Sequence, residues 1–192
     1  MTVYELTRPT AAQEQEAAWN QAIGGAANRQ ATFSVPADVA WAVVGCVLAD
    51  AVTVGDMPTL VSAIEALSEV TSVNGDQFYG QAEGTIETAG REFVLHVTAR
   101  SSATIGGGIP FTESVQKHNV VKPPLGKKWS LFVMRLPSQP DASDLTALDS
   151  AITGITGVTS AHNLVDGYTS SRQVGNANLT VAAHLRLDPV EV

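Results

Sequence analysis

The chain has 192 residues, of which 44% are hydrophobic and 16% are charged, and its net charge is −8. This composition excludes a disordered chain, and the acidic balance argues against a general nucleic-acid binder. The charged fraction lies below the roughly 25% of an average soluble domain. Such a chain suits either a protein that is packed inside an assembly or a soluble domain with a Ser/Thr-rich surface.

The first half of the chain contains a predicted strand followed by a predicted helix. Residues 41–48 form a continuous apolar run, which indicates a strand buried on both faces. Cys46 lies in this run, and as a lone cysteine it is expected to be a small core residue. Asp56 is placed at the N-cap of the helix, whose buried face includes Leu60 and Ile64.

A second strand and a long loop follow. Residues 91–100 alternate between apolar and polar side chains, which predicts a strand with one buried face. The other face carries His96, Thr98 and Arg100. Residues 101–127 are predicted to be an ordered loop that makes contacts, because loops beyond about 15 residues are usually functional or disordered.

The second half of the chain repeats the pattern of the first. A strand at residues 129–136 leads to a helix with Asp144 at its predicted N-cap, then to a loop ending near Tyr168, and then to a strand at residues 179–187 that contains His184. Each element lies 88 residues after a counterpart, and the matched residues include Trp41 with Trp129, Asp56 with Asp144, Leu60 with Leu148, and His96 with His184. The repeat predicts an internal duplication.

These elements predict an α+β fold in which an antiparallel sheet has helices packed on one face, duplicated about a pseudo-twofold axis. Residues 1–88 would form the first half, an N-terminal segment plus a strand-helix unit. Residues 89–192 would form the second half, in the order strand, loop, strand, helix, strand. We expect the two halves to merge into one domain.

Motifs of known enzymes are absent from the sequence. It contains no G-x-S-x-G nucleophile elbow, no P-loop and no H-E-x-x-H zinc motif. His96 and His184 alone make a weak metal site. We therefore expect no enzyme activity, no cofactor and no metal. The sequence also lacks a signal peptide and an apolar run of membrane-spanning length, so we expect a cytoplasmic protein without a membrane partner.

One segment is locally basic. It runs from Glu113 to Asp141 and has no acid between these two residues. Its cations are Lys117, Lys122, Lys127, Lys128 and Arg135. They could neutralise the phosphates of RNA or another polyanion, or they could form a solvated loop that keeps the protein soluble.

Residues 91–168 resemble the coat proteins of single-stranded RNA bacteriophages in the order of strand, glycine-containing loop, strand, Pro-bearing link, helix and Gly-Tyr tail. The resemblance implies a broad antiparallel sheet that faces the genome and binds an RNA hairpin. By this resemblance, six residues on the two strands are candidates for RNA contact: His96, Thr98, Arg100, Ser130, Phe132 and Met134. The basic segment adds Lys117, Lys122, Lys127 and Lys128 to the candidates. The expected function is that of a capsid or coat subunit, which assembles with copies of itself into a virion shell in the host cytoplasm, with single-stranded RNA as a candidate partner.

Two other functions fit the same pattern. Strand-helix-strand taken twice is also the order of a ferredoxin-like fold, so the chain could be a duplicated small-ligand-binding protein or enzyme. That alternative predicts a closed apolar pocket near His96 and His184. A decoration or tail protein of a DNA phage would share the structural role without contacting RNA.

Overall fold

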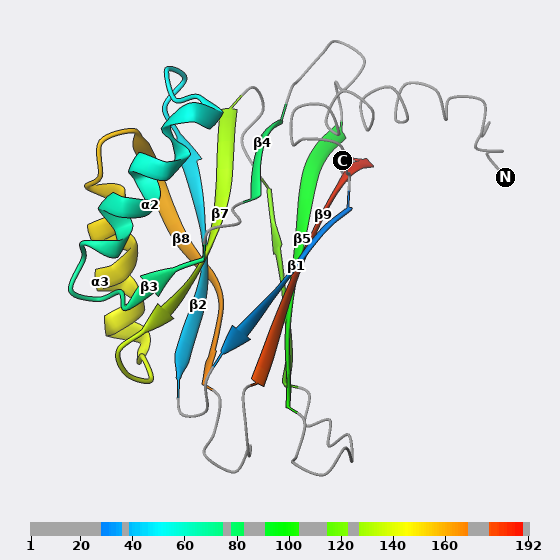
Figure 1. The fold of residues 1–192 in the computed structure, drawn as a ribbon. Coiled ribbons are helices and arrows are strands. Elements are labelled where there is room, and N and C mark those ends of the chain that lie inside the picture. The colour runs from blue at the N-terminus through cyan, green and yellow to red at the C-terminus, as the bar shows by residue number, and fades with distance from the viewer. Residues whose placement is uncertain are drawn as a thin grey trace, which may run out of the picture.

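The computed structural model describes residues 28–35, 39–74, 78–82, 91–103, 115–122, 127–168 and 177–189. It is an α+β structure with antiparallel sheets. Within these residues two sheets lie face to face, and two helices cover the far face of one of them, so the described part of the chain has three layers (Figure 1).

We call the sheet that packs against the helices the central sheet, and the sheet on its other side the outer sheet. The central sheet has the order β3 (Ser72–Val73), β7 (Lys127–Leu136), β2 (Ala40–Leu48) and β8 (Val158–Tyr168), and β4 (Phe78–Ala82) also pairs with β7. The outer sheet has the order β1 (Asn28–Val35), β9 (Ala177–Pro189), β5 (Arg91–Ala103) and β6 (Val115–Val121). The helices are α2 (Met57–Glu65), which follows a 3-10 turn η1 (Val54–Asp56), and α3 (Ala142–Thr153).

Strand β2 is buried on both faces, as its continuous apolar run predicts. Trp41 and Val43 pack toward the outer sheet, whereas Ala42 and Val44 pack toward the helices. Each of these four residues is at most 1% exposed. Because both faces are covered, the strand needs no polar alternation.

The two interlayer cores have different members. The core between the sheets contains Trp41, Val43, Val97, Ala99, Trp129, Leu131, Val133, Leu164, Val165, Leu179 and Val181. The core between the central sheet and the helices includes Ala42, Val44, Cys46, Leu48, Leu60, Ile64, Phe132, Met134, Leu136, Leu148, Ile152 and Ala161. Each helix therefore buries the face that its 3.6-residue periodicity predicts.

The predicted cap of the first helix is confirmed in position, since Asp56 is the N-cap of α2, but the predicted cap of the second helix is wrong. Asp141, and not Asp144, is the N-cap of α3, because its Oδ1 accepts the N–H groups of Ser143 and Asp144. Asp144 instead accepts the Asp141 N–H at 3.0 Å, which completes a capping box. Asp56 plays the corresponding part before α2, where its Oδ2 accepts the N–H of Thr53 at 2.7 Å.

Three predicted features of the sheet need correction. The chain forms two sheets and not one, because β5 and β9 pair with each other and not with β2 or β7. The predicted loop at residues 101–127 contains strand β6, and the predicted loop after α3 is strand β8. Strand β8 was hidden because a register shift opposite Val43 and Val44 breaks its period-2 pattern.

Strands that contain residues 88 positions apart pair with each other in both sheets. In the central sheet β2 pairs with β7, and Val44 lies opposite Phe132, 88 residues later. In the outer sheet β5 pairs with β9, and His96 lies opposite His184, again 88 residues later. At the edges of the central sheet, β3 pairs with β7 and β8 pairs with β2. Ser72 lies opposite Arg135, and Ser160 lies opposite Val47. The two pairs correspond, because Ser160 lies 88 residues after Ser72 and Arg135 lies 88 residues after Val47.

A hydrogen bond between each helix and the next strand also recurs. Glu65 at the end of α2 accepts the Val73 N–H through Oε1 at 2.9 Å. Thr153 at the end of α3 accepts the Ala161 N–H through Oγ1 at 3.0 Å. Both members of the second pair lie 88 residues after those of the first, so different side chains perform the same bond at matched positions.

Gly167 packs so closely on Trp41 that a Cβ atom would overlap the indole ring. We expect Gly167→Ala to lower the free energy of unfolding by about 3 kcal/mol, because the buried ring lies between strands that cannot shift freely. Gly55→Ala is the control, since the nearest atom to its added Cβ would be 3.5 Å away. Urea denaturation of both variants tests this, and equal stabilities would contradict the packing at Gly167.

Candidate functional site

The candidate RNA-contacting residues of β7 are buried. Ser130 and Phe132 are 0% exposed, and Met134 is 1% exposed. Phe132 and Met134 lie in the core under the helices. The interpretation of these three residues as an RNA-facing surface is therefore wrong, because the central sheet is covered on one face by helices and on the other by the outer sheet.

The described contacts of Lys117, Lys127 and Lys128 are with groups of their own chain. Lys127 pairs with Asp50, with Nζ 3.2 Å from Oδ1. Lys128 donates to the carbonyl oxygens of Asp50 and Val52 at 2.6 and 2.5 Å. Lys117 pairs with Asp166, with Nζ 3.3 Å from Oδ2. The sequence alone could not show this neutralisation, since these acids lie far from the lysines along the chain.

Strand pairing brings two of the remaining candidates beside one of these lysines, because Lys117 on β6 lies opposite Ala99 on β5, between Thr98 and Arg100. Lys122 is exposed just after β6. The backbones of His96, Thr98 and Arg100 lie on β5 in the middle of the outer sheet, while their side chains lie outside the described part of the structure. Their contact with RNA stays a prediction.

A polar cluster that the sequence did not reveal joins α3 to β8. Asp149 accepts the Asn163 N–H through Oδ2 at 2.9 Å. The Oδ1 atoms of Asp149 and Asn163 are buried, and neither has a hydrogen-bond partner within the described residues. Burial raises the pKa of Asp149, although the Asn163 N–H and the nearby His162 act in the opposite direction.

Cys46 lies in the core under the helices, as predicted. Burial raises the pKa of its thiol strongly, and the negative charge of Asp149 adds to the effect. The thiol is therefore protonated at neutral pH and is a poor nucleophile. Its role in the structure is that of a small apolar residue.

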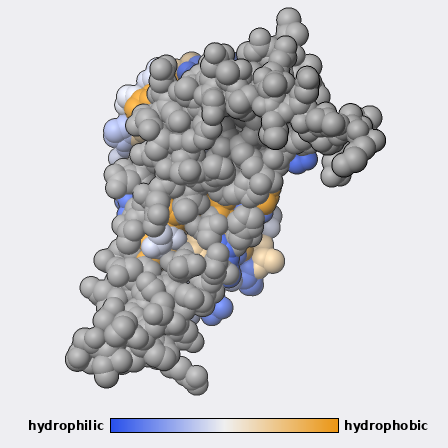
Figure 2. Space-filling model, turned by 90° about the vertical axis from the view of Figure 1, so that its right-hand side faces the viewer, coloured by the Kyte–Doolittle hydropathy of each residue, from blue (hydrophilic) through white to orange (hydrophobic). Residues whose placement is uncertain are grey.

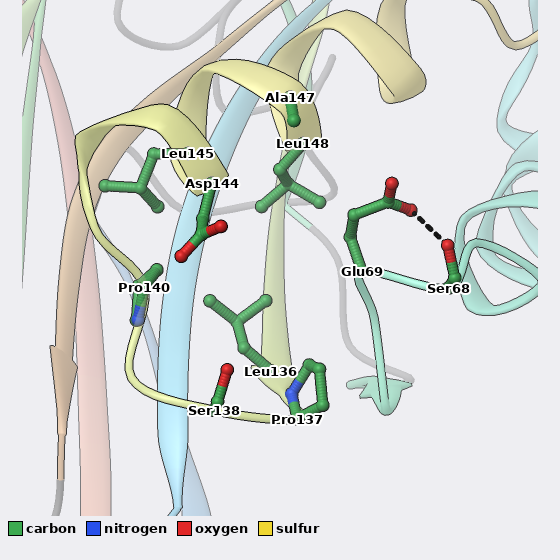
Figure 3. Close-up of a pocket in the computed structure, with 10 residues that line it drawn as sticks. All are labelled: Ser68, Glu69, Leu136, Pro137, Ser138, Pro140, Asp144, Leu145, Ala147 and Leu148. Atoms are coloured by element: carbon green, nitrogen blue, oxygen red, sulfur yellow. Dashed lines mark hydrogen bonds between the residues drawn. The ribbon is translucent and has the colours of Figure 1, made fainter.

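The cavities that are lined by described residues include the following two. One of about 290 Å³ lies between the first turns of α3 and the segment after β7 (Figure 3), and its charged lining residues are Glu69 and Asp144. The other, of about 170 Å³, is lined mainly by β2, β7 and β8, with Lys122 and His162 among its residues. The pocket that the ligand-binding alternative places near His96 and His184 stays a prediction, because the side chains of these two residues lie outside the described part of the structure.

The described surface is mixed in polarity. Viewed from the side of the outer sheet, hydrophobic and hydrophilic residues lie beside each other among the coloured atoms (Figure 2). Only three large apolar side chains of the described part are exposed: Val54, Val120 and Tyr168.

Within the ranges that the structure describes, no group of three His, Cys, Asp or Glu side chains is placed to hold a metal ion. None of the described helices is long and apolar enough to cross a membrane. Comparison of the chain with protein-family models, with curated proteins and with solved structures yields no match.

The raised pKa of Asp149 predicts a pH-dependent stability. The folded protein binds the proton of the Asp149 carboxyl more tightly than the unfolded chain does. The stabilisation that comes from this protonation is fully present below the unfolded pKa of about 3.9 and is lost as the pH rises through the folded pKa. Asp149→Asn should therefore raise Tm at pH 7, and the gain should shrink toward pH 4. Thermal melts between these pH values measure it.

Asp141→Asn is the control for that experiment. Hydrogen bonds from Ser143, followed by the N–H of Asp144, lower the pKa of the Asp141 carboxyl, so its substitution should not raise Tm at pH 7. Similar gains for both variants would mean that a general loss of negative charge, and not the buried site, causes the effect.

Proposed function

We propose that the protein is a self-associating structural subunit of a virus particle and that its chain consists of two copies of one folding unit, joined as a pseudo-dimer. The proposed unit has the order strand, strand, helix, strand, strand. In the first copy the fourth element is divided between β3 and β4, and in the second copy it is β8.

The observation that carries the proposal is the reciprocal pairing of the halves. The β2–β7 and β5–β9 ladders each contain one pair of opposed residues that are 88 apart, and such a pair is expected where a twofold axis crosses antiparallel strands. The matched helix-to-strand hydrogen bonds from Val73 and Ala161 support the same relation. Strands exchanged in this way are typical of two subunits that have become one chain.

A pseudo-dimer suits a shell-forming role because it presents related surfaces on opposite sides of one rigid body. The low fraction of charged residues, 16%, reduces the cost of removing the surface from water when copies associate. The resemblance of residues 91–168 to phage coat proteins points to the same class of function.

The virion role does not depend on RNA contact through β7. Ser130 and Phe132 are buried, and Lys117 and Lys127 are paired with carboxylates. These observations favour a structural subunit without RNA contact at this strand, which includes the decoration or tail protein of a DNA phage. For RNA contact, the outer sheet around His96 and Arg100 remains the candidate surface.

Self-association is the first expected outcome. Light scattering during gel filtration should show a mass of several chains that rises with concentration, and electron micrographs should show closed rings or shells. A chain that remains monomeric at high concentration would contradict the structural role.

Binding to labelled RNA across a salt series tests the choice between the virion roles. We expect little binding at physiological salt, and Lys127→Ala should not change it, because this lysine is already paired with Asp50. Binding that weakens steeply with salt and falls on Lys127→Ala would instead indicate phosphate contacts by the basic segment.

A further inference from the structure

The larger cavity is bounded by both apolar and acidic side chains. Leu136 and Leu148 line it from β7 and α3, and Pro137 and Pro140 line it from the segment between them. In Figure 3 the carboxylate of Asp144 points from the first turn of α3 toward that segment. The volume of about 290 Å³ exceeds that of an apolar cavity of about 150 Å³ that binds a benzene-sized molecule.

The matched position in the first half of the chain is filled by its own side chains. Val52 and Met57, which lie 88 residues before Pro140 and Leu145, are 7% and 5% exposed. The Ala49 N–H donates to the Gly157 carbonyl at 2.9 Å and holds the two connecting segments together. A Cβ at residue 157 would lie 3.1 Å from Cγ2 of Val52, so this glycine leaves room for the valine.

Two sequence differences explain why the second position is open. Pro137 replaces Ala49 and has no N–H to donate to the opposite segment. Glu69 replaces Gly157 and places a side chain where the glycine has none. The hydrogen bond from the Ala49 N–H to the Gly157 carbonyl, which closes the filled position, therefore has no counterpart between Pro137 and Glu69.

The charges also differ between the two positions. Around the filled position, Lys128 donates to the carbonyl oxygens of Asp50 and Val52. The counterpart of Lys128 is Ala40, and the open cavity has only acids, Glu69 and Asp144, among its charged lining residues. A complementary occupant would thus bring an aliphatic side chain and a cation, as Val52 and Lys128 do at the filled position.

The surface of the same chain carries such a pair at the end of β6. Val120 is 44% exposed, and Lys122 is exposed two residues later, whereas Val121 between them packs against the core between the sheets. We propose that the cavity beside α3 receives Val120 of a second copy, with Lys122 of that copy near Glu69 and Asp144. This inference rests on the proposed self-association and names the contact that produces it.

The contact joins two different surfaces, so it is heterologous. A contact of this kind repeats from copy to copy and produces rings, or open arrays when the rotation does not close. Each copy would use its β6 end toward one neighbour and its cavity toward another. This is the type of contact that extends an assembly beyond a dimer.

Sedimentation velocity of exposed-site variants tests the contact. Val120→Ser removes the inserted side chain, and Ala147→Trp fills the cavity from an exposed position on α3. Each should weaken self-association about tenfold, the effect expected for one buried valine. Val54→Ser is the control, because Val54 is 62% exposed and lies outside the contact.

Mixing the two variants gives a sharper result. The Val120→Ser chain retains an open cavity and the Ala147→Trp chain retains its valine, so an equimolar mixture should form heterodimers in preference to larger species. A matched charge pair adds to this. Asp144→Asn should weaken association, while Asp56→Asn should not, although both aspartates accept the same type of capping N–H.

The outcomes separate this contact from the proposed function. Assembly by all variants as in the wild type would overturn the contact and leave self-association standing. A wild-type chain that stays monomeric would overturn both. Loss of assembly in Val54→Ser as well would show that the effect is not specific to the cavity, and it would also overturn the contact.

Discussion

The antiparallel pairing of β2 with β7 is the constraint on which the rest of the structure depends. These strands pair over nine residues, from Ala40 opposite Leu136 to Leu48 opposite Lys128, and most of their side chains are buried. Since successive side chains point to opposite faces, the same two strands supply apolar residues to both cores. A change in their register by one residue would turn the side chains of each core toward the other core. One set of side chains packs against helices and the other against a sheet, so neither set would fit.

The fold was predictable where burial imposes a simple period. The strand at residues 41–48 and the apolar faces of both helices follow directly from the positions of apolar side chains. Strand β8 was not predictable in this way, because a register shift removes its alternation. The outer sheet as a separate layer was also hidden, since a half-buried strand such as β5 has the same pattern whether its partner is β7 or β9.

The candidate site was less predictable than the fold, for a different physical reason. A lysine in the sequence carries a charge, but its meaning depends on acids brought to it by folding. Asp50 is distant from Lys127 in sequence and in contact with it in space. Ser130 and Phe132 were misassigned because the covering of a strand on its second face depends on the neighbouring layer. The Asp149–Asn163 cluster likewise forms only when α3 docks on β8.

The comparison of one half with the other offers information that a single unit would not. Where two copies share a framework, any position at which they differ has a built-in reference. Ala49 and Gly157 close one position, while Pro137 and Glu69 leave its counterpart open, although the surrounding helix and strands are alike. If the two copies were identical, both positions would be closed. The chain would then lack the difference between its two sides that a contact between unlike surfaces needs. In the proposed assembly, divergence at one position would break that symmetry and supply a directional contact, which a chain needs if it is to add neighbours in more than one direction.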